Sequence, residues 1–174
     1  YLKATQVKEA EVIIATDDQL IFDHVQQFGG RAMMTSPNHP SGTDRIAEVA
    51  QNIESDIIIN LQGDEPLINP KQIEALIELM KNPLVKIGTQ CAKIKDVETL
   101  FDYNIVKVVR DINDKALYFS RQAIPAIRDQ KFEKWIAYAD YYKHIGIYGF
   151  KRMTLLELCT LPQTTFEKSE SLEQ

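Results

Sequence analysis

Two neighbouring acidic residues, Asp64 and Glu65, follow a strongly apolar stretch of the chain and could bind a metal ion. Gly63, just before them, permits a tight turn or the close approach of a ligand, and Pro66 stiffens the chain after them. Asp64 presents a hard oxygen ligand of the kind that Mg²⁺ takes alongside the phosphates of a substrate. An acidic pair in a turn is also common on a solvated surface, so this motif alone leaves both interpretations open.

A second polar motif lies earlier in the chain, where residues 41–45 read Ser-Gly-Thr-Asp-Arg. The free backbone N–H groups at a helix N-terminus, with nearby hydroxyls, could meet a nucleotide, and Arg45 would add a positively charged fork. Ser41 and Asp44 equally fit a capping box that needs no ligand. Both motifs follow predicted strands, so their conjunction carries more weight than either one alone.

The elements that must position these motifs alternate between strand and helix. Short apolar runs rich in β-branched residues predict strands, and apolar residues at helical spacing predict helices. Strands are expected at residues 12–15, 31–35, 57–61, 85–92, 105–110, 116–119 and 144–150. Helices are expected after a cap at Thr16 or Asp17, from Ser41, and from the cap Asn69 with Pro70 in the first turn. The stretch 166–174 also has a helical pattern.

This pattern predicts an α/β fold. The unbroken apolar run 57–61 suits a strand buried on both faces, so we expect it at the centre of the sheet. Strand–helix alternation followed by strand-rich sequence predicts an open, mostly parallel, Rossmann-like mixed sheet flanked by helices. Ligands of such sheets lie outside the carboxyl ends of the strands, which is where both motifs are expected.

Composition and charge limit the classes of function. The chain has 174 residues, a net charge of −5 and 44% hydrophobic residues, which indicates one globular domain. The acidic balance disfavours nucleic acid and anionic membranes as partners. No apolar run approaches the roughly 18 residues needed to cross a bilayer. A small phosphorylated molecule bound in a local basic pocket is compatible with this balance.

Five segments spread along the chain carry further motifs. They are residues 39–45 (His-Pro-Ser-Gly-Thr-Asp-Arg), 60–66 (Asn-Leu-Gln-Gly-Asp-Glu-Pro), 104–109 (Asn-Ile-Val-Lys-Val-Val), 116–121 (Ala-Leu-Tyr-Phe-Ser-Arg) with Ile-Pro at 124–125, and 144–149 (His-Ile-Gly-Ile-Tyr-Gly). In this order they resemble the 3-deoxy-manno-octulosonate cytidylyltransferases, also called CMP-Kdo synthetases. The resemblance extends over essentially the whole chain.

The resemblance implies a nucleotidyltransferase that transfers CMP from CTP to the anomeric hydroxyl of 3-deoxy-manno-octulosonate (Kdo), an eight-carbon keto-sugar acid. Pyrophosphate is released, and the product serves lipopolysaccharide synthesis. Mg²⁺ is the implied cofactor, with Asp64 as metal ligand and catalytic residue. Nucleotide binding is implied for Ser41, Gly42, Thr43, Arg45, Gln62 and Gly63. Sugar binding is implied for Arg121, His144, Tyr148, Glu173 and Gln174.

Arg121 is the first choice for the sugar carboxylate, because a guanidinium pairs with a carboxylate through two parallel hydrogen bonds. Cys91 and Cys159 are far apart in the sequence, which favours two reduced thiols and a cytoplasmic protein. The resemblance also implies a homodimer of single nucleotidyltransferase domains, joined by the later strands and the aromatic stretch 135–142. Members of the family begin with a strand and a loop that wraps the triphosphate, and they end with a second acidic metal ligand. We expect residues 1–174 to lack both, and, if these residues are the whole molecule, to bind CTP weakly with negligible turnover.

Two other functions stay open. A CMP-sialic acid synthetase, or another sugar nucleotidyltransferase, would use the same architecture with a different sugar, although segments 116–121 and 144–148 favour Kdo. A non-catalytic paralogue could hold a nucleotide without turnover. The residues also have plainer interpretations: Arg121 could be a surface charge, His144 a half-exposed side chain, and Tyr148 a residue that only packs against the sheet.

Overall fold

The computed structural model describes residues 1–63 and 67–172, and this part of the chain forms two compact units. The first unit comprises residues Tyr1–Gly88 and Gly146–Leu161, and the second comprises Thr89–Ile145 and the chain from Pro162 onward. Strands β4 (Ile87–Lys93) and β7 (Tyr142–Lys151) run from one unit into the other. The sequence predicted a single nucleotidyltransferase domain. Two compact units that share two strands do not decide between one domain and two, so this stays a prediction.

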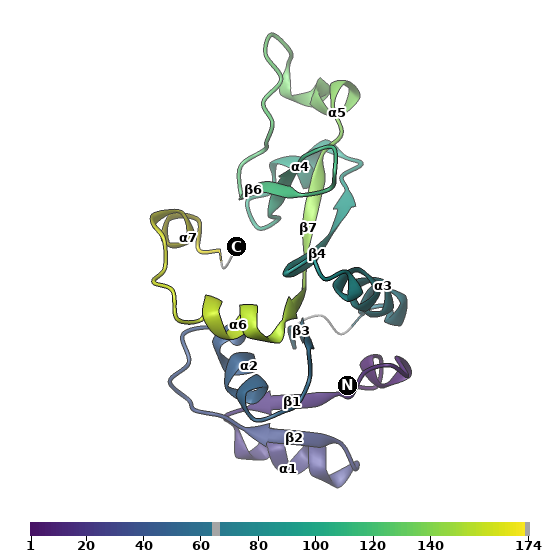
Figure 1. Cartoon of the computed structure of the whole chain (residues 1–174). Helices are drawn as coiled ribbons and strands as arrows, with labels where there is room; N and C mark the ends of the chain where they lie inside the picture. The colour runs from purple at the N-terminus through teal and green to yellow at the C-terminus, as the bar shows by residue number, and fades with distance from the viewer. Residues whose placement is uncertain (64–66, 173–174) are drawn as a thin grey trace. The chain divides into compact units, whose positions relative to one another are not determined.

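The first unit begins with a parallel strand pair joined by a helix (Figure 1). Its elements are η1 (Ala4–Gln6), β1 (Ile13–Thr16), α1 (Gln19–Gln27) and β2 (Arg31–Met34). The carboxylate of Asp18 caps α1 by accepting hydrogen bonds from the N–H groups of its first turn, whereas the sequence predicted Thr16 or Asp17. Gly29 follows the helix with φ of +74°, a left-handed conformation that suits glycine and ends the helix.

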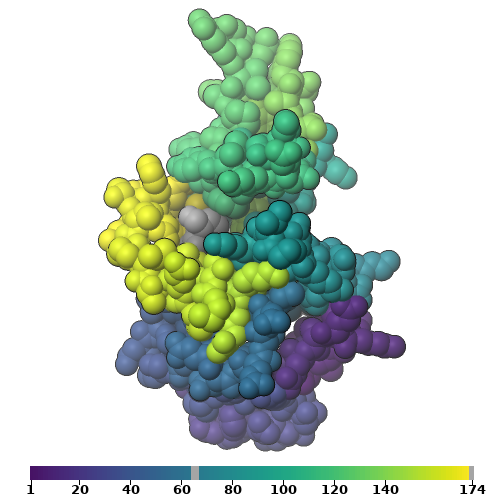
Figure 2. All heavy atoms as spheres, in the orientation of Figure 1, coloured from purple at the N-terminus to yellow at the C-terminus, as the bar shows by residue number. Residues whose placement is uncertain are grey.

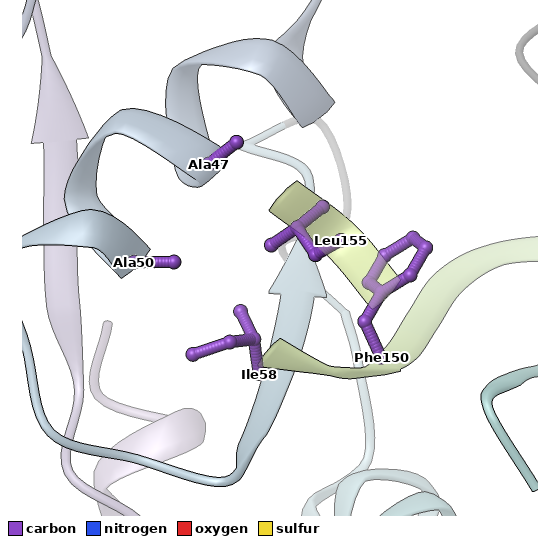
Figure 3. Packing of buried hydrophobic residues seen from close by; sticks show 5 residues of the cluster. All are labelled: Ala47, Ala50, Ile58, Phe150 and Leu155. Carbon is purple, nitrogen blue, oxygen red and sulfur yellow. The ribbon is translucent and has the colours of Figure 1, made fainter. Parts of the chain in front are cut away.

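Three helices pack around the core of the first unit. They are α2 (Gly42–Gln51), α3 (Pro70–Lys81) and α6 (Arg152–Leu158), and they accompany strand β3 (Ile57–Leu61). Ala47 and Ala50 of α2 face Ile58 of β3, Phe150 of β7 and Leu155 of α6 (Figure 3). The small alanine side chains let α6 approach α2 closely, and the atoms of α6 (yellow-green) lie against those of α2 (blue) in Figure 2.

Helix α3 forms as the sequence predicts. Asn69 caps it in a capping box with Gln72, and Pro70 occupies the first turn. Its apolar stripe is buried: Ile73, Leu76, Ile77 and Met80. The stripe packs against β7 at Gly149, where a Cβ atom would come within 2.6 Å of Cγ of Met80. The missing side chain at position 149 therefore allows α3 to approach the strand.

The second unit contains an antiparallel hairpin and short helices. Its elements are α4 (Val97–Phe101), β5 (Lys107–Arg110), β6 (Ala116–Ser120), η2 (Phe132–Lys134), α5 (Trp135–Tyr138) and α7 (Thr165–Glu170). Its core is formed by Ile94, Leu100, Trp135 and Tyr141. Part of the aromatic stretch 135–142 therefore belongs to the core of its own unit.

The sheet differs from the predicted one. Over the described residues the strands form the parallel β1–β2 pair and a five-stranded sheet in the order β3-β7-β5-β6, with β4 also paired to β7. The pairs β3–β7, β5–β6 and β5–β7 are antiparallel. The prediction of a mostly parallel sheet is therefore wrong, and β3 stands at one end of this order instead of at the centre. The mixed α/β class with flanking helices is confirmed.

The physical reason lies in what a hydrophobic pattern reports. Apolar β-branched residues indicate that a strand is buried, and they carry no information about the direction of its neighbour. The antiparallel partner of both β3 and β5 is β7, which comes much later in the sequence.

Within the described part of the chain, no helix combines the length and apolar character needed to cross a bilayer.

Candidate functional site

The motif at residues 41–45 forms the first turn of α2. Ser41 is the N-cap, and its Oγ accepts a hydrogen bond from the backbone N–H of Asp44 at 3.1 Å. The same hydroxyl donates to Oδ2 of Asp44 at 2.6 Å. The predicted capping role of Ser41 is confirmed. The N-terminus of α2, which carries a partial positive charge, therefore lies at this motif.

Arg45 is held by the chain that follows β1 and β2. Its NH1 group donates to Oγ1 of Thr35 at 2.6 Å and to the carbonyl oxygen of Ser36 at 3.3 Å. It also pairs with the carboxylate of Asp17 at 3.1 Å. Asp17 and Thr35 directly follow the carboxyl ends of the two parallel strands. The guanidinium is therefore fixed at the sheet edge where ligands of parallel strands bind.

Glu48 of α2 fixes the loop that leads into the motif. Its carboxylate accepts a hydrogen bond from the backbone N–H of Ser36 at 3.0 Å and pairs with Nε2 of His39. The hydrogen bonds from His39 and Ser36 hold the pKa of the Glu48 carboxyl below its ordinary value. Loop and motif are thus anchored to the same helix.

A buried asparagine joins the two motifs predicted from the sequence. Asn60 lies on β3 with its side chain fully buried, and its Nδ2 donates to Oγ1 of Thr43 at 3.2 Å. Its Oδ1 accepts a hydrogen bond from Nε2 of Gln62 at 3.1 Å. We call Thr43, Asn60 and Gln62 the polar relay. The motifs at 41–45 and 62–63 lie side by side through this relay, as the sequence predicted.

A cavity of about 1660 Å³ in the first unit is lined by both motifs. The predicted nucleotide residues in its wall are Gly42, Arg45, Gln62 and Gly63. Much of the remaining wall consists of apolar side chains of β1 and β3, including Ile13, Ile14, Ile57 and Ile59. Pockets for small molecules usually measure about 300–1,000 Å³. The cavity therefore exceeds the volume that a nucleotide needs, and polar residues form only part of its wall.

Asp64 lies outside the described residues, as do Glu173 and Gln174. Among the side chains that the structure does describe, no three His, Cys, Asp or Glu residues come together as a metal site. Gly63, beside Asp64, borders open space, because no described atom would lie within 4 Å of a Cβ placed there. The roles of Asp64, Glu173 and Gln174 stay predictions.

Arg121, in the second unit, follows β6 and contacts the end of α7. Its Nε donates to the carbonyl oxygen of Glu170 at 2.7 Å, NH1 to that of Tyr103 at 3.1 Å, and NH2 to that of Ser171 at 3.3 Å. A guanidinium carries five N–H donors, so these bonds to described residues leave two of them. Two donors are sufficient for a bidentate bond to a carboxylate.

Glu170 of α7 binds β6 and the residue after it through its carboxylate. Its carboxylate accepts hydrogen bonds from the backbone N–H of Arg121 at 2.6 Å, Oγ of Ser120 at 2.7 Å and the hydroxyl of Tyr118 at 3.2 Å. Burial raises the pKa of Glu170, but these hydrogen bonds outweigh it and the net pKa is lowered. The charged carboxylate thus holds the end of α7 at Arg121.

His144 lies in the second unit and is neutral at physiological pH. Burial lowers its pKa from 6.5 to about 4. Its Nε2 lies 2.8 Å from Oγ1 of Thr89, and the Thr89 hydroxyl donates to the carbonyl oxygen of Ile145 at 3.3 Å. The tautomer of His144 decides whether Nε2 or the Thr89 hydroxyl donates in this hydrogen bond. The rings of Phe119 and His144 form a T-shaped pair, with centroids 5.2 Å apart. His144 can therefore act as a hydrogen-bonding group and not as a cation.

Tyr148 belongs to the first unit, where it stands opposite Asn60 in the antiparallel β3–β7 register. Its ring stacks on that of Phe150, with centroids 6.0 Å apart. Of the described residues predicted to bind the sugar, Arg121 and His144 share the second unit, whereas Tyr148 does not.

The hydrogen-bonding roles of two residues were not predicted from the sequence, although both residues lie in segments that carry the family resemblance. Asn60 and Lys107 are both fully buried polar side chains on strands. The available signal was a single polar residue inside an apolar strand, Asn60 in Ile-Ile-Ile-Asn-Leu and Lys107 in Ile-Val-Lys-Val-Val. Such residues are rarely buried without partners, so their position alone predicts a hydrogen-bonding role.

Comparison with known proteins places these features in context. A family model described as cytidylyltransferase matches residues 1–174. A 3-deoxy-manno-octulosonate cytidylyltransferase of Thermodesulfovibrio yellowstonii is 50% identical over 173 aligned positions, covering 94% of this chain and 68% of the relative. The protein of that name from Trichlorobacter lovleyi is 45% identical over 183 positions, covering 99% and 70%. A solved structure of CMP:2-keto-3-deoxy-manno-octonic acid synthetase complexed with CTP has a TM-score of 0.92 and 44% identity, covering 100% of this chain and 70% of that one.

Proposed function

Because the chain belongs to the cytidylyltransferase family, we propose that it transfers CMP from CTP to Kdo, with release of pyrophosphate, for lipopolysaccharide synthesis. The observation that carries this proposal is the 44 to 50% identity, over nearly the whole chain, to proteins named for that reaction. The chain spans 68 to 70% of the length of these relatives.

The reaction joins the anomeric hydroxyl oxygen of Kdo to the α-phosphorus of CTP. The bond from the α-phosphorus to the oxygen that bridges to the β-phosphate breaks, pyrophosphate leaves with that electron pair, and the hydroxyl releases its proton. Catalysis of such a transfer depends on positioning and on positive charge near the phosphates. In the first unit, Arg45 and the N-terminus of α2 supply positive charge at the cavity that the two motifs line.

The polar relay supports nucleotide binding by the first unit. The amide of Gln62 and the hydroxyl of Thr43 both bond to the buried side chain of Asn60, so their positions are fixed before any ligand arrives. Fixed hydrogen-bonding groups bind a polar ligand with less loss of conformational entropy than mobile ones. We assign Ser41, Gly42, Thr43, Arg45, Gln62 and Gly63 to the cytidine nucleotide.

The sugar acid is assigned to a second set of residues. The two remaining N–H donors of Arg121 suit the Kdo carboxylate. The neutral imidazole of His144 suits a sugar hydroxyl, because hydroxyls both donate and accept hydrogen bonds. Tyr148, Glu173 and Gln174 complete the proposed set.

The proposal includes Mg²⁺, with Asp64 as a ligand. When bound, the ion would neutralise charge on the phosphates of CTP. We expect Asp64→Asn to lower kcat at least about 100-fold, because the change removes the negative charge of a proposed metal ligand. The thermal midpoint Tm should not fall, because the substitution keeps the size of the side chain and does not alter the hydrophobic core. Glu74→Gln, which neutralises an exposed carboxylate on α3, is the matched control. A rate near that of the wild type in Asp64→Asn would remove Asp64 from the metal site.

We further propose a cytoplasmic homodimer. Exposed apolar side chains of the second unit are candidates for its interface: Leu117, Phe132 and Tyr138. Trp135 and Tyr141 do not qualify, because they are buried in the core of their own unit.

Substrate choice tests the proposed reaction directly. The full-length protein is incubated with CTP, Mg²⁺ and either Kdo or N-acetylneuraminate, and pyrophosphate release is measured. We expect pyrophosphate release with Kdo and none with N-acetylneuraminate. Faster release with N-acetylneuraminate would favour the CMP-sialic acid alternative. Calorimetric binding of CTP without turnover on either sugar would favour a non-catalytic paralogue.

A further inference from the structure

Lys107 is a fully buried lysine on β5, in the second unit. Lysine is almost never completely buried unless its charge is compensated, because removing an ammonium from water is costly. Burial lowers the pKa of Lys107, the carboxylates of Asp102 and Glu170 raise it, and the net direction is downward. The protein therefore keeps this lysine buried at some cost in stability.

The hydrogen bonds of the Lys107 ammonium compensate for that burial. Its Nζ donates to the carbonyl oxygen of Asp102 at 2.8 Å, to that of Ile105 at 2.5 Å, and to that of Arg121. An ammonium has three N–H donors, and these three described acceptors use all of them. Lys107 consequently has no lone pair to offer as a base or nucleophile, and its geometry is that of a cross-link.

The cross-link joins the two segments that hold Arg121. The first is the turn 102–105, where the carbonyl oxygen of Tyr103 accepts a hydrogen bond from NH1 of Arg121. The hydroxyl of Tyr103 also accepts a hydrogen bond from Nε2 of Gln122 at 2.7 Å. The second segment is the backbone of Arg121 itself, whose carbonyl bonds to Lys107 and whose N–H bonds to Glu170. One buried ammonium thus anchors both the backbone of Arg121 and the turn that orients its guanidinium.

We propose that Lys107 is a positioning residue for the sugar acid: its ammonium fixes Arg121 and the turn 102–105 so that the two remaining guanidinium donors point at the Kdo carboxylate. This inference rests on the proposed function, because it needs Arg121 to bind the sugar. Without the ammonium, the carbonyl oxygens of Ile105 and Arg121 would lose the Lys107 donor, and that of Asp102 would keep only the backbone N–H of Ile105 at 3.2 Å. The turn and Arg121 would have to move to regain hydrogen bonds. A shift of Arg121 would weaken a bidentate bond, whose strength depends on the alignment of both donors.

The test compares the two Michaelis constants of Lys107→Met, which keeps much of the side-chain volume but removes the three donors. We expect KM for Kdo to rise at least about tenfold and KM for CTP to change less than about twofold. Lys115→Met, at an exposed position in the β5–β6 turn, is the control and should leave both constants unchanged. A purely structural role would lower Tm and leave the ratio of the two constants at its wild-type value, which would overturn the proposal.

A double-mutant cycle tests whether Lys107 acts through Arg121. In an Arg121→Ala background, adding Lys107→Met should change KM for Kdo less than about twofold, because the group it positions is gone. A full tenfold effect in that background would overturn the proposal. If Lys107→Met does not fold, Lys107→Gln retains two N–H donors and should give an intermediate KM for Kdo; a wild-type value would again contradict us.

The wild-type measurement separates the two proposals. Absence of turnover with Kdo in the full-length protein would refute the proposed function and this inference with it. Turnover with Kdo, together with an unchanged KM for Kdo in Lys107→Met, would refute the positioning role alone.

Discussion

Gly42 stands where the amide of Gln62 leaves no room for a side chain. A Cβ atom at position 42 would lie 2.7 Å from Oε1 of Gln62 and 3.0 Å from Nε2. We expect Gly42→Ala to push this amide away from Asn60 and to raise KM for CTP about tenfold, since the change disturbs ligand binding more than chemistry. Tm should change little, because the amide is the end of a flexible side chain.

Steady-state kinetics and thermal unfolding check this expectation, with Gln51→Ala at the other end of α2 as the control. A KM for CTP within twofold of the wild type would mean that the position of the Gln62 amide does not matter for the nucleotide.

His144 gives the protein a defined response to acid. Its pKa is about 4 in the folded protein and 6.5 in its ordinary environment, so between these values the unfolded chain binds a proton that the folded chain does not. Stability therefore falls as the pH falls from about 6.5 to about 4, by about 3 kcal/mol in total at 1.36 kcal/mol per pKa unit. Above pH 6.5 this contribution is constant.

Urea unfolding of the wild type and His144→Asn at pH 7.5, 5.5 and 4.5 checks the prediction. Because carboxyl groups titrate in both proteins, the informative quantity is the difference between their free energies of unfolding. That difference should shift in favour of His144→Asn as the pH is lowered. A difference that does not change with pH would contradict the buried, neutral state of His144.

At the residue scale, sequence spacing predicted local partners and missed distant ones. The cap at Ser41 involves residues three positions apart, and it was predicted correctly. The partners of Lys107 include Arg121, and those of Arg121 include Glu170, far along the chain. A single sequence shows that Lys107 is a polar residue in an apolar strand, but it does not show which carbonyl groups fold onto it.

At the element scale, the helices and strands were predicted best where local signals were redundant. Helix α3 has a capping box, a proline in its first turn and a regular apolar stripe. Helix α6 has seven residues and no side-chain cap, and no helix was predicted there. Strand β3 was predicted with its observed bounds, although its neighbour and direction were not. Local pattern thus determines where an element forms, and contacts distant in sequence determine how it pairs.

Strand β7 offers two glycines that separate close packing from backbone effects. A Cβ at Gly149 would meet Cγ of Met80 at 2.6 Å, whereas one at Gly146 would meet no described atom within 4 Å. We expect Gly149→Ala to destabilise the fold by about 1–3 kcal/mol, because the core between α3 and β7 would be overpacked. Gly146→Ala, on the same strand, should change stability by no more than about 0.5 kcal/mol. Chemical denaturation measures both, and equal effects would show that α3 adapts to the added methyl group.

At the scale of the whole molecule, the predicted nucleotide residues gather in the first unit. Arg121 and His144 lie in the second. Each substrate should therefore stabilise a different part of the chain. We expect CTP to slow amide hydrogen exchange in α2 and β3, and Kdo to slow it in the turn 102–105 and around Arg121. Mass spectrometry of exchanged peptides distinguishes these patterns. Protection by Kdo confined to the first unit would place the sugar acid away from Arg121.

The polar relay also limits which amino-acid substitutions this protein can accept during evolution. Replacing Asn60 by an apolar residue would leave both Thr43 and Gln62 without the buried partner that now orients them. Because two side chains bond to Asn60, an apolar residue at position 60 should lower stability until both of them are replaced as well. Positions 43, 60 and 62 should therefore covary among homologous sequences or remain fixed together, and a resurrected ancestor that differs at Asn60 alone should unfold more readily than its descendants.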